Sequence, residues 1–375
     1  MEMNRAMQTE RRIEAMRSSM KSAGVDAVIV PVREGLNWET CFYLTGFRGS
    51  SSVFYATSDQ AGLITDGRYL AQAASQTRIP VIDQASTPMM DVLGDIISGI
   101  GGIGTIGFQA DRVTCDLMGK IREFGKSTVD VSPLFSRLRR KKDGGEIGDI
   151  RVAADLASSA LLKTLSEGEK DLTESSFAAR LEYNIRMAGA EGGWGSHEFI
   201  VASGPRSALP HGTPTGRKIE PGEMITIDFG SRFNGYISDI TRSFCDGEPP
   251  EWAVEAHELL TEAQSAAIAL LEPGRPARDV DMAARSVIEK AGFGDAFSHS
   301  LGHGIGLEVH EAPFLSFRSE DILAEGDVVT VEPGIYFPGK GGMRLEDDFY
   351  ITAEGRECLT SSLLSTILPL GQRTE

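Results

Sequence analysis

The second half of the chain repeats one pattern: two segments with apolar residues at helical spacing, then two strand-like segments that carry acidic residues. In the first copy the strand-like segments are Glu223–Phe229 and Tyr236–Phe244. In the second copy they are Asp327–Glu332 and Arg344–Thr352. A repeat of this kind predicts two similar halves that face each other, with a site between them.

The first 140 residues have a different pattern, in which short strand-like and helix-like segments alternate. Asp26–Val32, Ser52–Ala56 and Gly62–Thr65 are rich in β-branched and aromatic residues, which is typical of strands. This part of the sequence has no cluster of metal-ligating or nucleophilic side chains. It therefore predicts an α/β domain without chemistry of its own.

A dense basic run, Arg137–Lys142, ends this part and is followed by the breaker cluster Asp143–Gly145. Such a run can bind anions or nucleic acid, but the chain has 54 acidic against 37 basic side chains, and this surplus repels phosphate backbones. We interpret the run as a solvated linker and expect no nucleic-acid partner. The predicted domains are residues 1–142 and 143–375.

Cysteines and hydropathy indicate the compartment. The four cysteines are widely spaced and form no CxxC pair, which favours reduced thiols. The N-terminal segment lacks the apolar core of a signal peptide. The longest uncharged stretch, Ile96–Ala110, is rich in glycine and shorter than the roughly 20 apolar residues that span a bilayer. We expect a cytoplasmic protein without a membrane partner.

The first pair of strands in the repeat carries two aspartates. Asn234-Gly235 is a strong signal for a two-residue hairpin turn. That turn pairs position 228 with position 241, and it places Asp239 on the same face as Asp228, about 7–8 Å away between Cα atoms. The two carboxylates repel each other unless a cation lies between them. On its own, this hairpin also fits two solvent-facing aspartates.

The second pair of strands makes a metal site the better interpretation. Glu332 ends an apolar strand, and Glu346 follows fourteen residues later. Between the two hairpins lies His303, framed by glycines that allow close backbone approach. Four carboxylates and one imidazole suit two ions such as Mn²⁺, Co²⁺, Fe²⁺ or Zn²⁺, whereas Mg²⁺ and Ca²⁺ prefer oxygen ligands alone.

These side chains also resemble a known site. The ordered set Asp228, Asp239, His303, Glu332 and Glu346 is similar to the five-ligand dinuclear centre of the pita-bread metallopeptidases, which include methionine aminopeptidase, aminopeptidase P, prolidase and creatinase. The surrounding segments resemble the Xaa-Pro peptidase branch, that of aminopeptidase P and prolidase. They are Ser203–His211, Asp228–Gly230, Ser238–Arg242, Gly302–Gly306, His310–Pro313, Val331–Gly334 and Arg344–Asp347, with Tyr43–Gly49 and Thr65–Tyr69 in the N-terminal part.

The resemblance spans nearly the whole chain and implies its fold class, α/β (α+β). It implies an N-terminal creatinase/prolidase-like α/β domain followed by a C-terminal pita-bread metallopeptidase domain. Creatinase has this fold without a metal, and catalytically inactive binding proteins of this fold characteristically lose the ligands. Because all five ligand positions carry ligand-competent side chains here, we expect a metalloenzyme.

The resemblance also implies roles for the ligands. Asp228 would chelate one ion, His303 and Glu332 would hold the other, and Asp239 and Glu346 would bridge the two. The implied cofactor is a pair of divalent ions, with Mn²⁺ expected and Co²⁺, Fe²⁺ or Zn²⁺ as alternatives. A hydroxide formed from a water shared by both ions would attack the peptide carbonyl.

Further residues are implied around the substrate. His211 and His310 would flank the substrate as catalytic residues. His197 precedes a strand that leads to the site, and we expect it to line the pocket. The implied partner is a proline-containing peptide. A homodimer is also implied, because relatives of this type are commonly dimers.

One position bears on the length of the substrate. A dipeptidase must bind the free carboxylate of proline, for which a bidentate arginine is the natural partner. Many prolidase-like sequences have an arginine directly after the His-Glu-x-Pro segment, where this chain has Phe314. Arg318 or Arg344 are the possible replacements, although Arg344 lies beside a metal ligand. We therefore expect an Xaa-Pro aminopeptidase, with an Xaa-Pro dipeptidase as the alternative and with Phe314 and Arg344 as substrate contacts.

Overall fold

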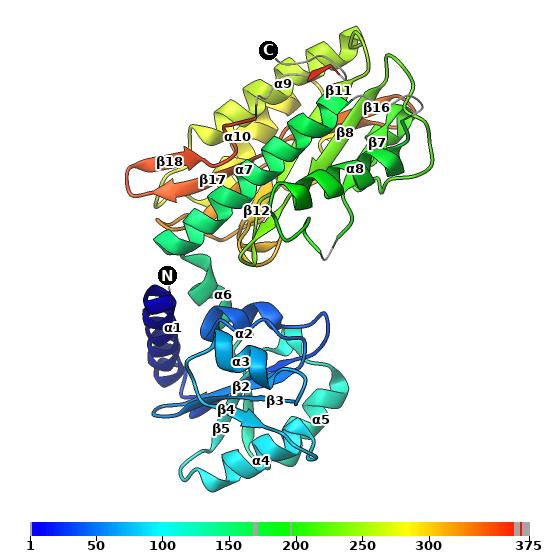
Figure 1. Ribbon diagram of the computed structural model, residues 1–375. Coiled ribbons are helices and arrows are strands. Elements are labelled where there is room, and N and C mark those ends of the chain that lie inside the picture. The colour runs from blue at the N-terminus through cyan, green and yellow to red at the C-terminus, as the bar shows by residue number, and fades with distance from the viewer. Residues whose placement is uncertain (1, 168–171, 196, 364–367, 370–375) are drawn as a thin grey trace. The chain divides into compact units, whose positions relative to one another are not determined.

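The computed structural model describes residues 2–167, 172–195, 197–363 and 368–369. The chain forms two compact units, Met1–Arg139 and Arg140–Glu375 (Figure 1). The division lies three residues before the predicted domain boundary. No helix of the described residues is both long and apolar enough to cross a membrane.

The N-terminal unit is built on a six-stranded sheet with the order β4-β3-β2-β1-β5-β6. All strands run parallel except β2, which is antiparallel to both neighbours. The strands are β1 (Ala27–Val32), β2 (Ser52–Thr57), β3 (Ala61–Thr65), β4 (Val81–Asp83), β5 (Thr105–Phe108) and β6 (Ser127–Asp130). The three strands predicted from their β-branched residues are therefore confirmed as β1, β2 and β3.

Helices complete the N-terminal unit and cover its sheet. They are α1 (Glu2–Ser22), α2 (Trp38–Thr45), α3 (Leu70–Gln76), α4 (Met89–Gly99), α5 (Cys115–Glu123) and α6 (Ser132–Arg140). Leu93 of α4 and Ile121 of α5 pack with Ile29 and Ile106 of the sheet in one apolar core. Every residue of β1 is buried, which explains why its sequence is apolar throughout rather than alternating.

Two sheets form the centre of the C-terminal unit. One has the strand order β19-β11-β8-β7, and the other has the order β13-β12-β14-β17-β18. The first contains β7 (Ile200–Ser203), β8 (Met224–Phe229), β11 (Ile240–Cys245) and β19 (Leu368–Pro369). The second contains β12 (Gly302–Gly304), β13 (Glu311–Leu315), β14 (Val328–Val331), β17 (Asp347–Thr352) and β18 (Gly355–Cys358). Two short ladders join β9 (Arg232–Phe233) with β10 (Tyr236–Ile237) and β15 (Gly334–Phe337) with β16 (Gly341–Arg344).

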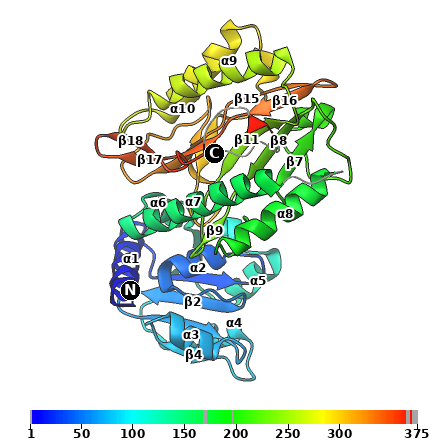
Figure 2. The same ribbon diagram turned by 45° about the horizontal axis from the view of Figure 1, so that its top comes forward.

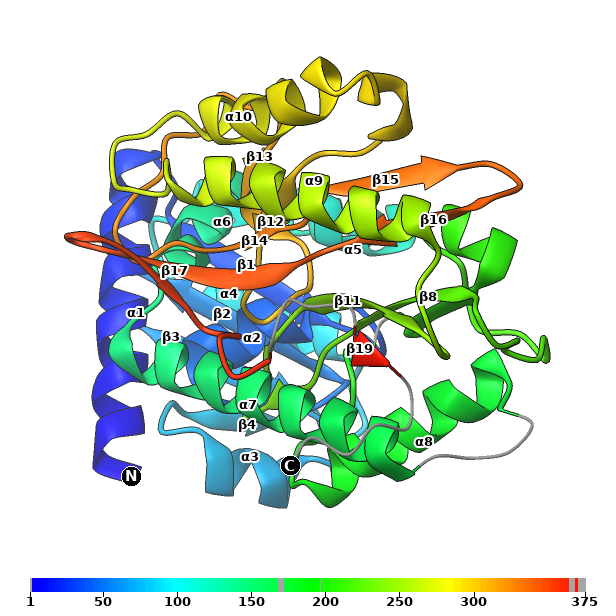
Figure 3. The same ribbon diagram turned by 90° about the horizontal axis from the view of Figure 1, so that it is seen from above.

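Each sheet of this unit has its own pair of helices. Figures 2 and 3 show α7 (Gly144–Glu167) and α8 (Glu174–Met187) on one side of the strands, and α9 (Glu251–Ile268) and α10 (Ala277–Lys290) on the other. Ile225, Ile227 and Phe229 of β8 belong to the apolar core that contains α7 and α8. Val329 and Val331 of β14 belong to the core of α9 and α10.

This packing decides where polar side chains of the strands point. Successive side chains of a strand lie on opposite faces. Since Ile227 and Phe229 face the helices, Asp228 between them faces away from the helices. The same alternation turns Thr330 of β14 away from α9 and α10, because Val329 and Val331 face them. The chain therefore has a polar face on each sheet, away from its helices.

The two hairpins have the same construction. Asn234 and Gly235 have φ angles of 49° and 88°, as the predicted turn requires, and Asp228 pairs with Thr241 in the predicted register. In the second hairpin, the ladders β14–β17 and β15–β16 share one register, with a break between them. Glu332 and Glu346 are opposite each other at this break. The predicted repeat of a carboxylate-bearing hairpin is confirmed.

The basic run is not a solvated linker, so that prediction was wrong. Arg140 donates to both carboxylate oxygens of Asp327 at 2.7 Å. The side chain of Lys142 is 1% exposed, and its Nζ lies 3.3 Å from Glu311 Oε2. These acidic partners lie more than 165 residues further along the chain, so a local charge count could not identify them.

Candidate metal centre

The five predicted metal-ligating residues lie in or directly beside strands of the C-terminal unit. Ligand atoms of Asp239, His303 and Glu346 all lie within 4.8 Å of one another. His303 Nε2 lies 3.8 Å from Asp239 Oδ2 and 3.4 Å from Glu332 Oε1. The first sheet supplies Asp228 and Asp239, and the second supplies His303, Glu332 and Glu346. The two halves of the repeat therefore meet at one group of side chains.

The donor set fits divalent metal ions. Asp239 Oδ1 and Asp228 Oδ1 are buried without a hydrogen-bond partner among the described residues. An unpaired buried carboxylate oxygen is costly unless a cation or a donor reaches it. With His303, Glu332 and Glu346 these residues offer the mixed nitrogen and oxygen ligands that first-row metals accept.

Burial and mutual repulsion raise the carboxylate pKa values in the absence of a cation. Burial raises the pKa of Asp239 well above its ordinary value, and the charge of Glu346 raises it further. Burial and the same neighbour raise the pKa of Glu332. Burial, then the charge of Asp228, raise the pKa of Glu346 to about 8. A bound cation would relieve each of these costs.

His303 has the protonation state that a metal ligand needs. Burial and the neighbouring His310 lower the pKa of His303 to about 3, so the ring is neutral at physiological pH. Its Nδ1 lies 3.1 Å from the carbonyl oxygen of Gly304. A proton on Nδ1 would be donated to that carbonyl, and this tautomer leaves the lone pair of Nε2 directed at Asp239 and Glu332.

The metal-free protein should lose stability as pH rises from about 4.5 to 8. An exposed glutamate titrates near 4.5, but the pKa of Glu346 in the folded protein is about 8, so in this window only the folded state retains the proton. The stabilising contribution of that proton is complete below the pKa of the unfolded chain and is lost as pH rises through 8. Melting temperatures of metal-free wild type and Glu346→Gln measure this effect. The wild type should show the steeper decline, and equal slopes would contradict the assignment.

A layer of hydrogen bonds holds the ligands in place. Glu346 Oε2 accepts a hydrogen bond from Thr241 Oγ1 at 2.6 Å. Asp348 Oδ2 accepts one from the backbone N–H of Asp239 at 2.9 Å. Arg242, which is 1% exposed, donates to the backbone carbonyl of Glu346 and to Asp347. These bonds tie β11 of the first sheet to β17 and the break before it in the second.

Arg344 belongs to this supporting layer. The sequence predicted it as a substrate contact, but its side chain is bound by neighbouring protein groups. Its Nη2 donates to Asp228 Oδ2 at 2.5 Å, and its Nη1 donates to Tyr336 Oη at 2.9 Å. Its Nε donates to Thr241 Oγ1 at 2.9 Å. All three nitrogens of this buried side chain are therefore occupied, so Arg344 does not offer a free fork for a substrate carboxylate.

The predicted catalytic histidines lie beside this group. His310 has part of its surface exposed, and its ring centroid lies 4.3 Å from that of His303. His211 is also exposed and follows Pro210, whose carbonyl accepts a hydrogen bond from Arg344 Nη1 at 3.1 Å. Burial and the nearby His197 lower the pKa of His310, so its ring is neutral at physiological pH.

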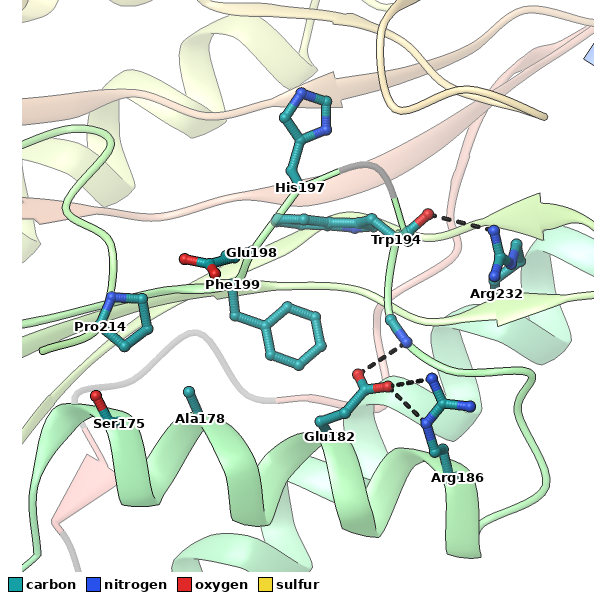
Figure 4. A pocket seen from close by; sticks show the side chains of 12 residues that line it. Ser175, Ala178, Glu182, Arg186, Trp194, His197, Glu198, Phe199, Pro214 and Arg232 are labelled. Atoms are coloured by element: carbon teal, nitrogen blue, oxygen red, sulfur yellow. Dashed lines mark hydrogen bonds and ion pairs between the residues drawn. The ribbon is translucent and has the colours of Figure 1, made fainter. Parts of the chain in front are cut away.

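His197 lies one step further out. Its ring is exposed and packs edge-on against His310, with centroids 6.0 Å apart. It also borders a cavity of about 370 Å³ between α8 and the segment that leads to β7 (Figure 4). In Figure 4 the His197 ring points away from α8, with Trp194 between them. None of the five predicted metal-ligating residues lines this cavity, so it is separate from the candidate metal site.

Sequence reasoning missed His299. Its Nε2 lies 2.9 Å from Tyr336 Oη, and its Nδ1 lies 3.9 Å from Glu332 Oε2. Burial and the charge of Arg344 lower the pKa of His299 to about 3. Its one local signal is its position four residues before His303. Residues 299–301 lie outside the strands, so side-chain alternation along a strand does not predict its place.

Phe314 lies at the edge of the same site. Strand β13 pairs with β12, and Phe314 is directly opposite His303. Side chains of directly opposed residues lie on the same face of a sheet. Phe314 is 47% exposed, so it offers an apolar surface beside His303.

Comparisons with known proteins match both parts of the chain. Residues 148–353 match the model of metallopeptidase family M24, and residues 12–141 match the creatinase/prolidase N-terminal domain. An Xaa-Pro dipeptidase of Pyrococcus furiosus is 34% identical over 94% of this chain and 98% of its own length. The crystal structure of an X-Pro aminopeptidase from Thermotoga maritima is 39% identical, with a TM-score of 0.87, and the match covers 92% of this chain and 98% of that one.

A solved Xaa-Pro dipeptidase from Bacillus anthracis is 36% identical, with a TM-score of 0.90, and the match covers 96% of this chain and all of that one. The mixed α/β architecture, with a creatinase-like domain before the metallopeptidase domain, is thus the one expected from the sequence. With Asp239, His303 and Glu346 gathered where its two sheets meet, and with Glu332 and Asp228 beside them, the chain belongs to metallopeptidase family M24 and is a hydrolase.

Proposed function

We propose that the protein is a dinuclear-metal exopeptidase that hydrolyses the bond between an N-terminal residue and proline, and that it accepts peptides longer than two residues. The observation that carries the substrate length is Phe314, which borders His303 with an exposed apolar ring where a carboxylate clamp would need a cation. Relatives named X-Pro aminopeptidase and Xaa-Pro dipeptidase support the choice of an Xaa-Pro substrate.

The side chains around the centre suit hydrolysis of this bond. Two divalent ions held by the five ligands would supply an acidified water as nucleophile and would polarise the carbonyl. The amide before proline has no N–H, so an enzyme that acts on it cannot bind the substrate by that group. His310, neutral beside His303, is placed to donate a hydrogen bond to the substrate. As a neutral base it could take up the proton released by the nucleophilic water and pass it to the leaving proline nitrogen.

An Xaa-Pro dipeptidase is the second candidate function. Three of the similar proteins bear that name, and each of them matches more than nine tenths of this chain. Against it stands Arg344, whose three nitrogens are engaged by Asp228, Tyr336, Thr241 and Pro210. Arg318 remains as the other candidate for a carboxylate clamp. A catalytically inactive binding protein is disfavoured, since all five ligand positions are kept.

The remaining properties follow from the same proposal. We expect Mn²⁺ as the working metal, with Co²⁺, Fe²⁺ or Zn²⁺ as substitutes, because the ligands are four carboxylates and one imidazole. The proposed domain division follows the basic run, and the proposed assembly is a homodimer in the cytoplasm. Sedimentation at micromolar concentration tests the dimer, which a species of about 40 kDa alone would refute.

The test compares kcat/KM on two peptides with the same first residue, Xaa-Pro and Xaa-Pro-Yaa, in the presence of Mn²⁺. We expect the tripeptide to be cleaved at least as well as the dipeptide, because no cation beside His303 selects a free proline carboxylate. Phe314→Arg should shift the ratio toward the dipeptide by about tenfold, the value of one charged hydrogen bond of about 1.4 kcal/mol.

A matched control is Phe317→Arg, which adds the same charge at an equally exposed phenylalanine three residues further along. This variant should leave the ratio close to that of the wild type. Rapid cleavage of the dipeptide by the wild type without cleavage of the tripeptide would replace our choice with the dipeptidase. Cleavage of neither peptide would refute both.

A further inference from the structure

Lys142, the last residue of the basic run, is a buried cation in the C-terminal unit. Its side chain is 1% exposed, and that of its partner Glu311 is 7% exposed, with 3.3 Å between Nζ and Oε2. A lysine retains its charge in such surroundings only where an anion compensates for the lost hydration. The backbone N–H of Lys142 also donates to the carbonyl of Gly326 at 2.9 Å, so the residue is held at both ends.

Glu311 closes the loop that presents His310. Its Oε1 accepts hydrogen bonds from the backbone N–H groups of Leu307 at 3.0 Å and of Glu308 at 3.1 Å. His310 is the residue directly before Glu311, and its ring lies 4.3 Å from that of His303. The direction of the His310 side chain therefore depends on where the carboxylate of Glu311 is held.

The loop is packed around this ion pair. A Cβ atom on Gly306 would lie 2.9 Å from Glu311 Oε2 and 3.0 Å from Lys142 Cε, so a side chain at Gly306 would displace the pair. The carbonyl of Gly306 accepts a hydrogen bond from Ile237 N–H at 2.9 Å. Ile237 is two residues before Asp239, so the same loop is fastened to the strand that leads to a metal-ligating residue.

We propose that Lys142 is a positioning residue for His310. Through its ion pair with Glu311 it fixes the loop 305–311, and this keeps the His310 ring beside His303. The inference rests on the proposed function, because that function gives His310 its part at the substrate. Lys142, at the end of the basic run and 168 residues before His310, would thus have a role in the site.

The first test replaces Lys142 by methionine, which keeps the length of the side chain and removes its charge. We expect kcat on Xaa-Pro peptides to fall about 100-fold, the effect of displacing a catalytic group by about 1 Å, with KM within about threefold and with unchanged bound metal. The control is Arg140→Gln, which removes the ion pair to Asp327 from the same basic run. This control should lower the melting temperature and keep kcat within about threefold.

A double-mutant cycle separates positioning from general damage. In a His310→Ala background, adding Lys142→Met should lower kcat by a further factor of less than about three, because the ring that Lys142 positions is already absent. If the loss of kcat in the double variant equals the product of the losses in the two single variants, the proposal is overturned. If Lys142→Met fails to fold, Lys142→Met/Glu311→Gln replaces the whole ion pair with neutral groups and takes its place in the cycle. The glutamine keeps a side-chain oxygen that can accept the backbone N–H groups of Leu307 and Glu308.

A spectroscopic measurement tests the position without activity. The chain has six histidines, few enough for their ring signals to be separated by NMR in zinc-loaded protein. The signal that disappears in His310→Ala should shift in Lys142→Met and stay in place in Arg140→Gln. An unchanged His310 signal in Lys142→Met would overturn the proposal. Absence of Xaa-Pro hydrolysis in the wild type would instead refute the proposed function, and the NMR result would still decide the position.

Discussion

Replacing Asp239 with asparagine should remove bound metal and lower kcat/KM on Xaa-Pro peptides by about a thousandfold or more, while the protein stays folded. Asp239 is 3% exposed, and its Oδ1 has no hydrogen-bond partner among the described residues. An asparagine amide is uncharged and ligates divalent ions weakly. Metal ions contribute several kcal/mol to the stabilisation of such a transition state, and each 1.4 kcal/mol corresponds to a factor of ten.

The same substitution should not harm the metal-free protein. Burial and the charges of Glu346 and Asp228 raise the pKa of Asp239, so an uncharged amide at this position relieves repulsion. The metal-free variant should therefore melt at the same temperature as the metal-free wild type or higher. Metal analysis, kinetics and thermal melting of both forms measure the three effects.

Asp348→Asn is the matched control for this prediction. Asp348 is fully buried, and it accepts the N–H of Asp239, which an asparagine carbonyl also accepts. Burial keeps the pKa of Asp348 high, so the loss of its carboxyl group changes the local charge little. This variant should retain its metal and lose less than about tenfold in rate. Full hydrolysis after dialysis against a chelator would refute metal dependence.

Local signals account for the part of the site that the sequence predicted. Asn234-Gly235 sets the hairpin turn, and that turn alone determines that Asp228 pairs with Thr241. The apolar residues at alternate positions of β8 and β14 determine which face packs on helices, and so which face carries carboxylates. In each case the information lies within about ten residues, where turn chemistry and side-chain alternation operate.

The parts that sequence reasoning missed depend on partners far apart in the chain. Lys142 pairs with Glu311, 169 positions away in the sequence, and Arg344 pairs with Asp228, 116 positions away. Phe314 pairs with His303 across β12 and β13, and the register of this ladder shifts between His303 and Gly304. Regular strand alternation does not predict such a shift. Such contacts follow from the packing of the two halves. The sequence could therefore draw attention to a charged residue, but it could not identify the residue that pairs with it.

The histidines around the centre should separate into two classes when each is replaced by alanine. His303→Ala should lose metal, because the neutral Nε2 of His303 lies 3.4 Å from Glu332 and 3.8 Å from Asp239, within the group of ligand atoms. His211→Ala and His310→Ala should keep their metal and lose about 10²–10⁴-fold in kcat, the usual range for an acid–base or oxyanion contact.

The geometry supports this division. His310 lies beside His303 with part of its surface exposed, and its neutral state leaves it a proton donor or acceptor rather than a fixed cation. His211 follows Pro210, whose carbonyl is bound by Arg344, so its backbone is tied to the supporting layer while its side chain is exposed. Metal content and kcat of the three variants decide the matter. Equal metal loss in all three would mean that the rings of His211 and His310 bind the ions as well, and the separation of ligand from catalytic residue would have to be abandoned.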